Sequence, residues 1–120
     1  MRILLMEDEA LIAMDVEQLC LDCGAADVVI ARNLAQAEAA LAAHPRFHAA
    51  IVDVMLGGTE TTGFARRLQQ DKLPFVFATG YTERERLFEQ FPSIKVIGKP
   101  YVGSELVQAV SEAARISDLT

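Results

Sequence analysis

The sequence lacks a long apolar run and lacks an excess of positive charge. Its opening, MRILLMEDEA, is interrupted by acids after a few apolar residues, so it has neither the apolar region of a signal peptide nor the length of a membrane span. Eleven Lys and Arg stand against seventeen Asp and Glu, which gives a net charge of −6. Such a charge disfavours binding to nucleic acid or to an anionic membrane. We therefore expect a soluble, cytoplasmic protein with no nucleic-acid or membrane partner.

Cysteine is scarce as well. The only two, Cys20 and Cys23, form a C-x-x-C pair within a stretch of helical periodicity. The pair has no second pair or histidines to complete a zinc site, and it does not follow a strand as a thioredoxin-type motif does. We expect both cysteines to fill the core side of a helix, since a free cysteine behaves as a small hydrophobe.

The 120 residues suffice for one domain and show no repeat, low-complexity segment or linker. Short runs of Ile, Val, Leu and Phe predict buried strands, at 3–6, 28–31, 49–54, 74–79 and 95–98. Helical spacing separates these runs, and strict alternation of this kind is typical of a parallel sheet covered on both faces. We predict an α/β, flavodoxin-like fold of five βα units in three layers, with strand order 2-1-3-4-5 and residues 1–120 forming a single domain.

The helices are marked by their apolar residues and their ends. Leu11, Met14 and Leu19 mark the first helix, which Gly24 closes, and Asn33 caps the second. A weak fourth helix is expected within 82–91, where charges fill the first turn. The longest irregular stretch, LGGTETTG at 56–63, is expected to be a mobile loop.

Polar residues follow four of the five apolar runs, where a sheet of this kind binds its ligands. They are Glu7, Asp8 and Glu9 after the first, Asp53 at the end of the third, Thr79 and Tyr81 after the fourth, and Lys99 followed by Pro100 after the fifth. Each alone has a structural explanation, such as a helix start, a turn cap or a surface lysine. Asp53 is the hardest to explain so, because Asp is depleted in strand interiors. Together they predict one polar site at the carboxyl edge of the sheet.

Carboxylates gathered at one place repel one another and need a cation. Lys99 supplies one charge, and Mg²⁺ is a hard cation that takes oxygen ligands and keeps waters for phosphate oxygens. A carboxylate beside Mg²⁺ and a lysine can attack phosphorus and form an aspartyl phosphate. On this reading Asp53 is the nucleophile, and the Thr79 hydroxyl donates to a phosphoryl oxygen.

This set of residues resembles the receiver domains of two-component response regulators, and the resemblance covers the whole chain. It implies that Asp53 is the phosphoacceptor, assisted by Thr79 and Lys99, and that the Lys99–Pro100 bond is cis. It also implies a Mg²⁺ site, with Mn²⁺ as a substitute, that is formed by Asp8, Asp53 and the backbone carbonyl of Met55, with Glu7 acting through water.

The stretch PFVFATGY at 74–81 resembles the signature of a receiver subgroup named for the motif FATGUY. These receivers are often single-domain proteins that work with histidine kinases of the HWE or a related type. Two departures from other receivers agree with this: Gly57 stands where most carry a proline, and Val96 stands where most carry a switch aromatic. Tyr81 is the candidate replacement for that switch.

The resemblance implies a stand-alone phosphoacceptor rather than a conventional enzyme, with self-catalysed phosphotransfer, slow autodephosphorylation and no output domain. Its signal passes through protein contacts on the face of the fourth helix, fifth strand and fifth helix, or it serves as a phosphate sink. The alternatives are a Mg²⁺ phosphohydrolase with an aspartyl nucleophile and a phosphate-independent pseudo-receiver. Met55 stands where such a phosphohydrolase needs a second acid, which counts against the first alternative. A flavodoxin-type cofactor binder is disfavoured, because the acids after the first strand would repel phosphate.

Overall fold

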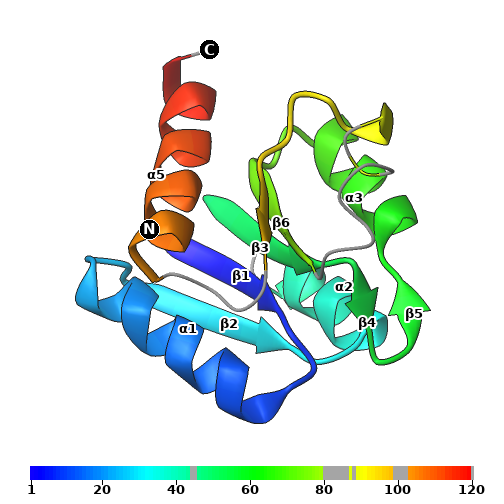
Figure 1. Cartoon of the computed structure of the whole chain (residues 1–120), viewed down its shortest axis with the longest axis horizontal. Coiled ribbons are helices and arrows are strands. Elements are labelled where there is room, and N and C mark those ends of the chain that lie inside the picture. The colour runs from blue at the N-terminus through cyan, green and yellow to red at the C-terminus, as the bar shows by residue number, and fades with distance from the viewer. Residues whose placement is uncertain (44–45, 80–86, 88, 99–102, 120) are drawn as a thin grey trace.

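A computed structural model of the chain describes residues 1–43, 46–79, 87, 89–98 and 103–119. At its centre lies a five-stranded parallel sheet in the order β2-β1-β3-β6-β7 (Figure 1). The strands are β1 (Arg2–Met6), β2 (Asp27–Ala31), β3 (Ala49–Asp53), β6 (Phe75–Thr79) and β7 (Val96–Gly98). Counted among themselves, these strands have the order 2-1-3-4-5, so the predicted flavodoxin-like topology is confirmed.

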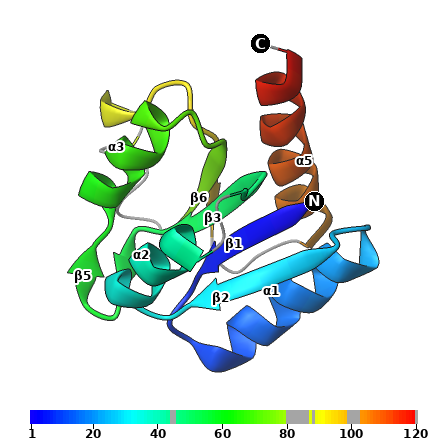
Figure 2. The same ribbon diagram turned by 180° about the vertical axis from the view of Figure 1, so that it is seen from behind.

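Helices cover both faces of this sheet. On one face lie α1 (Ala10–Asp22) and α5 (Gly103–Leu119), and on the other lie α2 (Leu34–Ala43) and α3 (Thr62–Gln70), as the two opposite views in Figures 1 and 2 show. The predicted three-layer arrangement is therefore confirmed. None of the helices in the described ranges combines the length and the apolar character that a membrane crossing requires.

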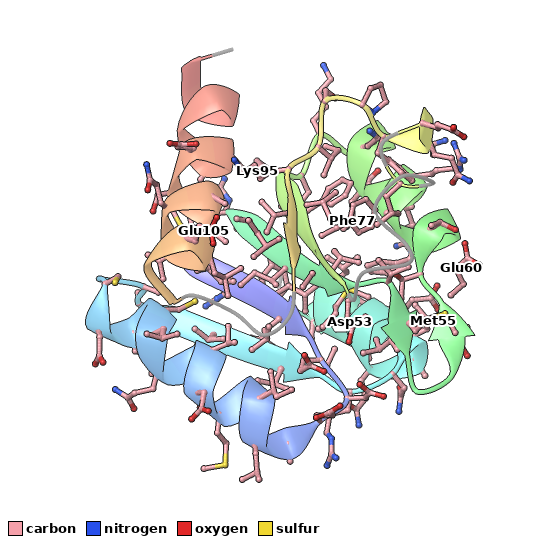
Figure 3. All side chains as sticks on the ribbon, viewed as in Figure 1. Asp53, Met55, Glu60, Phe77, Lys95 and Glu105 are labelled. Atoms are coloured by element: carbon pink, nitrogen blue, oxygen red, sulfur yellow. The ribbon has the colours of Figure 1, made fainter. Side chains whose placement is uncertain are left out.

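The two core clusters differ in composition. The cluster beneath α2 and α3 contains Phe47, Phe64, Phe75, Phe77 and Phe91. The rings of Phe77 and Phe91 pack edge to face with their centroids 5.1 Å apart, and the Phe77 side chain lies on the α3 side of β6 (Figure 3). The described part of the cluster beneath α1 and α5 contains aliphatic residues and Cys20 but no phenylalanine. Side chains of β6 alternate between the two clusters, so the apolar run of 75–78 reflects burial on both faces.

The predicted first helix is present as α1, but two of the apolar residues that mark it in the sequence lie on its exposed side. Leu11 and Met14 are 77% and 61% exposed, whereas Ala13, Val16 and Cys20 are buried. Small residues at spacings of three and four define the buried face of this helix. Cys20 fills the core as expected, but Cys23 is exposed, and both thiols are free.

The segment 56–63 does not form the predicted irregular loop. Strands β4 (Met55–Leu56) and β5 (Thr59–Glu60) pair as an antiparallel hairpin, which leads into α3. Gly57 and Gly58 form its two-residue turn with φ values of +57° and +80°. Positive φ at both positions is the requirement of a type I′ turn, which glycine meets without strain.

The predicted helix ends are confirmed where the structure describes them. Gly24 follows α1 with a φ of +102°, and the Asn33 side chain caps α2 by accepting a hydrogen bond of 2.8 Å from the Gln36 N–H. The predicted fourth helix lies largely outside the described residues. Leu87 and Phe91, which belong to it, are fully buried.

Candidate functional site

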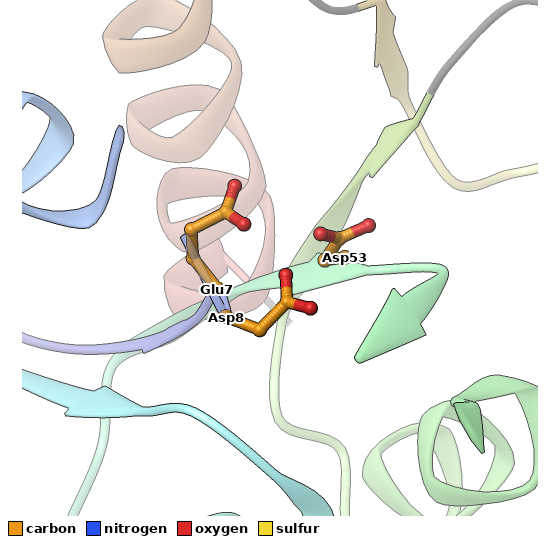
Figure 4. Close-up of side chains that lie close together, drawn as sticks. All are labelled: Glu7, Asp8 and Asp53. Carbon is orange, nitrogen blue, oxygen red and sulfur yellow. The ribbon is translucent and has the colours of Figure 1, made fainter. Parts of the chain in front are cut away.

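The carboxyl edge of the sheet brings together three acidic side chains. Met6 at the end of β1 pairs with Val52, so Glu7 and Asp8 follow β1 at the level where Asp53 ends β3. One carboxylate oxygen from each of the three lies within 4.8 Å of the others (Figure 4). The sequence placed these acids at neighbouring strand ends, and the structure brings them to one point.

Two of the three acids are withdrawn from solvent. Glu7 is fully buried and Asp53 is 6% exposed, while Asp8 is partly buried. The Glu7 carboxylate accepts a hydrogen bond of 3.2 Å from the Glu9 N–H. Burying like charges together is costly unless hydrogen bonds and a cation offset the repulsion. Oxygen donors gathered in this way suit a hard divalent cation.

Asp8 is held at both its side chain and its backbone. Its carboxylate accepts a hydrogen bond of 3.1 Å from the Gly57 N–H, and its carbonyl oxygen accepts one of 3.1 Å from the Arg32 guanidinium. Sequence reasoning missed both contacts. Arg32 directly follows Ala31, the last residue of β2, and this position after a strand end could have indicated that its side chain reaches the site.

Asp53 is held by the chain that follows it. Its carboxylate accepts a long hydrogen bond of 3.4 Å from the Met55 N–H. Its carbonyl oxygen accepts a bond of 2.7 Å from the hydroxyl of Thr61, which also lies 3.1 Å from the Val54 carbonyl oxygen. Thr61 is fully buried, and nothing in TETTG distinguishes it from its neighbours before the hairpin is known.

The strand register places the backbone of Thr79 next to the acids. Asp53 pairs with Ala78, so Thr79 is one residue further along the adjacent strand, and it pairs in turn with Gly98 of β7. The Thr79 side chain is not described, and Tyr81, Lys99 and Pro100 lie outside the described residues. Val96 is partly buried against the phenylalanine-rich cluster.

No model of a protein family matches the sequence, and no curated protein matches it. Solved structures do match. The receiver domain of the PhyR response regulator from Erythrobacter litoralis is 28% identical with a TM-score of 0.81, and the match covers 93% of this chain and 88% of that one.

Two further structures extend this likeness. The anti-anti-sigma factor PhyR from Bartonella quintana is 25% identical with a TM-score of 0.83, and the match covers 99% of this chain but 50% of that one. The receiver domain of the Francisella response regulator 1452 is 18% identical with a TM-score of 0.81, over 97% of this chain and 98% of that one. Together with the sheet order and the acidic cluster, these likenesses show that the chain has the fold of a response regulator receiver domain.

Proposed function

We propose that this protein is a phosphoacceptor of a two-component system, which takes a phosphoryl group from a histidine kinase onto Asp53. One observation carries the proposal: in a receiver fold, the oxygens of Glu7, Asp8 and Asp53 gather within 4.8 Å at the carboxyl edge of β1 and β3. Such a cluster of oxygens is the ligand type that Mg²⁺ takes at sites that also bind phosphate.

The residues of the cluster fit the metal site that the resemblance implies. Asp8, Asp53 and the carbonyl of Met55 would hold Mg²⁺ directly, with Glu7 acting through water and Mn²⁺ as a substitute. The bound cation would supply positive charge against the phosphoryl oxygens. In the transfer, an Asp53 oxygen attacks phosphorus while the phosphorus–nitrogen bond of the donor phosphohistidine breaks and its imidazole leaves. Lys99 and the Thr79 hydroxyl would bind the transferred oxygens.

A surface of α1 is suited to the phosphodonor. Leu11, Met14 and Leu21 are exposed to 77%, 61% and 40%, and their spacing places them along one side of the helix. Because α1 begins directly after Glu9, an apolar helix docked on this stripe would have one end near the acidic cluster. A Leu11→Gln, Met14→Gln variant should then slow transfer from the kinase while uptake from a small phosphodonor stays unchanged.

The remaining features of the proposal come from PFVFATGY and from the resemblance. The kinase is of the HWE or a related type, and the protein acts in the cytoplasm. Its signal passes through the face of the fourth helix, β7 and α5 with Tyr81 as the switch, or the protein drains phosphate from the kinase.

The proposal is tested by incubating the protein with Mg²⁺ and acetyl phosphate and measuring the intact mass. We expect a gain of one phosphoryl group that EDTA prevents and that Asp53→Asn abolishes. Asp27→Asn, at the other end of the sheet, serves as the matched control and should gain mass normally. An absent gain, or an equal gain in Asp53→Asn, would remove the proposal. A phosphohydrolase would instead turn over donor continuously with little retained phosphate.

A further inference from the structure

We propose that the β4–β5 hairpin forms part of the metal site, with Gly57 and Thr61 as positioning residues that hold Asp8 and Asp53 ready for the cation. This inference rests on the proposed function and concerns two residues to which that function assigns no role. Both act through the acids rather than on the metal or the phosphoryl group.

Thr61, which follows β5, forms hydrogen bonds with the end of β3, where Asp53 lies, and with the next residue. Its backbone N–H donates to the Val54 carbonyl oxygen at 2.8 Å, and its buried hydroxyl lies 2.7 Å from the Asp53 carbonyl oxygen. These two hydrogen bonds hold the beginning and the end of segment 53–61 together. The backbone of Met55, which carries the carbonyl assigned to the cation, lies inside this segment.

Gly57 contacts Asp8, which lies in the loop after β1. Its N–H donates to Oδ2 of Asp8 at 3.1 Å, and this contact joins the hairpin turn to the loop after β1. An N–H donor fixes the rotation of a carboxylate and still leaves its second oxygen available. The contact depends on the left-handed backbone at Gly57, where φ is +57°, and not on a lack of space, since an added Cβ would lie 3.7 Å from its nearest neighbour.

The hairpin is itself fixed to the core. Leu56, between the two contacts, is 1% exposed and belongs to the phenylalanine-rich cluster. A rigid support of this kind reduces the freedom that the acids lose when they bind a cation. Hydrogen-bond partners of metal ligands typically change metal affinity by roughly 10- to 100-fold when they are removed.

The first test compares Thr61→Val with Thr61→Ser in the unphosphorylated protein. The measurement is the Mg²⁺ dissociation constant by calorimetry, at a temperature where melting curves show every variant to be folded. We expect Thr61→Val, which keeps the shape but loses the hydroxyl, to bind Mg²⁺ roughly 10-fold or more weakly. Thr61→Ser restores the donor and should bind close to the wild-type affinity. Equal affinities in the two variants would overturn the role of Thr61, even if Thr61→Val melted at a lower temperature.

The second test separates the donor at Gly57 from the shape of the turn. Proline at either Gly57 or Gly58 is incompatible with the positive φ and disturbs the turn, but only Gly57→Pro removes the N–H that reaches Asp8. We expect Gly57→Pro to weaken Mg²⁺ binding clearly more than Gly58→Pro does. Equal weakening would overturn the role of Gly57.

The outcomes also distinguish this inference from the proposed function. If the wild-type protein binds Mg²⁺ and gains a phosphoryl group while the Thr61 and Gly57 variants match their controls, the function stands and the hairpin role falls. If the wild-type protein binds no Mg²⁺, both fall.

Discussion

The amino and carboxyl edges of the parallel sheet differ in the charges that they bring together. At the amino edge, Arg2 and Asp27 form an ion pair of 3.0 Å, and His48 accepts a hydrogen bond of 2.9 Å from the Arg2 N–H. At the carboxyl edge, three acids converge and two of them are buried. Charges of opposite sign in contact are sufficient to explain a structural role. Like charges buried together are costly unless hydrogen bonds or a cation offset the repulsion, and the metal site is therefore proposed at the carboxyl edge.

The largest contrast between the edges concerns Mg²⁺. We expect Mg²⁺ to raise the melting temperature of the wild-type protein, because a ligand that binds only the folded state stabilises it. Asp8→Asn should remove this rise, since the site loses both a charge and a ligand oxygen. Asp27→Asn, at the amino edge, should retain the full rise. If both variants keep the rise, the carboxyl edge is not the metal site.

A second contrast lies within the amino edge, where Cys20 and Cys23 border a hollow beside Met1 and Ile3. Burial, and to a smaller extent the neighbouring Cys23, raises the pKa of Cys20 from 9.0 to about 11. At pH 8 its thiolate fraction is then roughly 100-fold below that of an ordinary thiol. We expect iodoacetamide to modify exposed Cys23 first, as peptide mapping would show. Equal rates would mean that α1 opens readily.

The same raised pKa gives stability a pH dependence. The folded state holds the Cys20 proton more tightly than the unfolded state does, so this contribution is complete below pH 9 and is lost as the pH rises through about 11. Cys20→Ala should lose this dependence, whereas Cys23→Ala should keep it. Denaturant unfolding at pH 8 and pH 11 measures the difference.

The smallest expected contrast is the sign of the change in the free energy of unfolding when an acid at each edge is neutralised. Without Mg²⁺, Asp8→Asn should raise the free energy of unfolding by about 1 kcal/mol, because it relieves repulsion at the carboxyl edge. Asp27→Asn should lower it by up to about 1 kcal/mol, since the pair with Arg2 is partly exposed. Urea unfolding at low salt measures both changes, and high salt should reduce them. Changes of the same sign would contradict the distinction between the edges.

The sequence was sufficient to predict the parts of the site that depend on strand ends. An acid directly after an apolar run is visible in the sequence, and the alternation of strands and helices puts Glu7, Asp8 and Asp53 at the same edge. Contacts that depend on a turn type were not visible in this way. Two adjacent glycines fit both a loop and a type I′ hairpin, and only the hairpin brings Gly57 to Asp8 and buries Thr61.

The buried residues of α1 could not be predicted from the size of its apolar side chains. Leu11 and Met14 are the larger residues, but the smaller Ala13 and Val16 are buried while the larger ones are exposed. The helix that follows the acidic site thus carries large apolar residues on its surface, and this exposure is the observation behind the proposed docking of the phosphodonor on α1.

The central claim is that Asp53 is the residue that receives the phosphoryl group. The most direct measurement is to treat the protein with Mg²⁺ and acetyl phosphate, reduce it with borohydride, which converts an aspartyl phosphate to homoserine, and sequence the peptides by mass spectrometry. The account predicts homoserine at position 53 and its absence when EDTA replaces Mg²⁺. Homoserine at another aspartate, or none at any position, would contradict it.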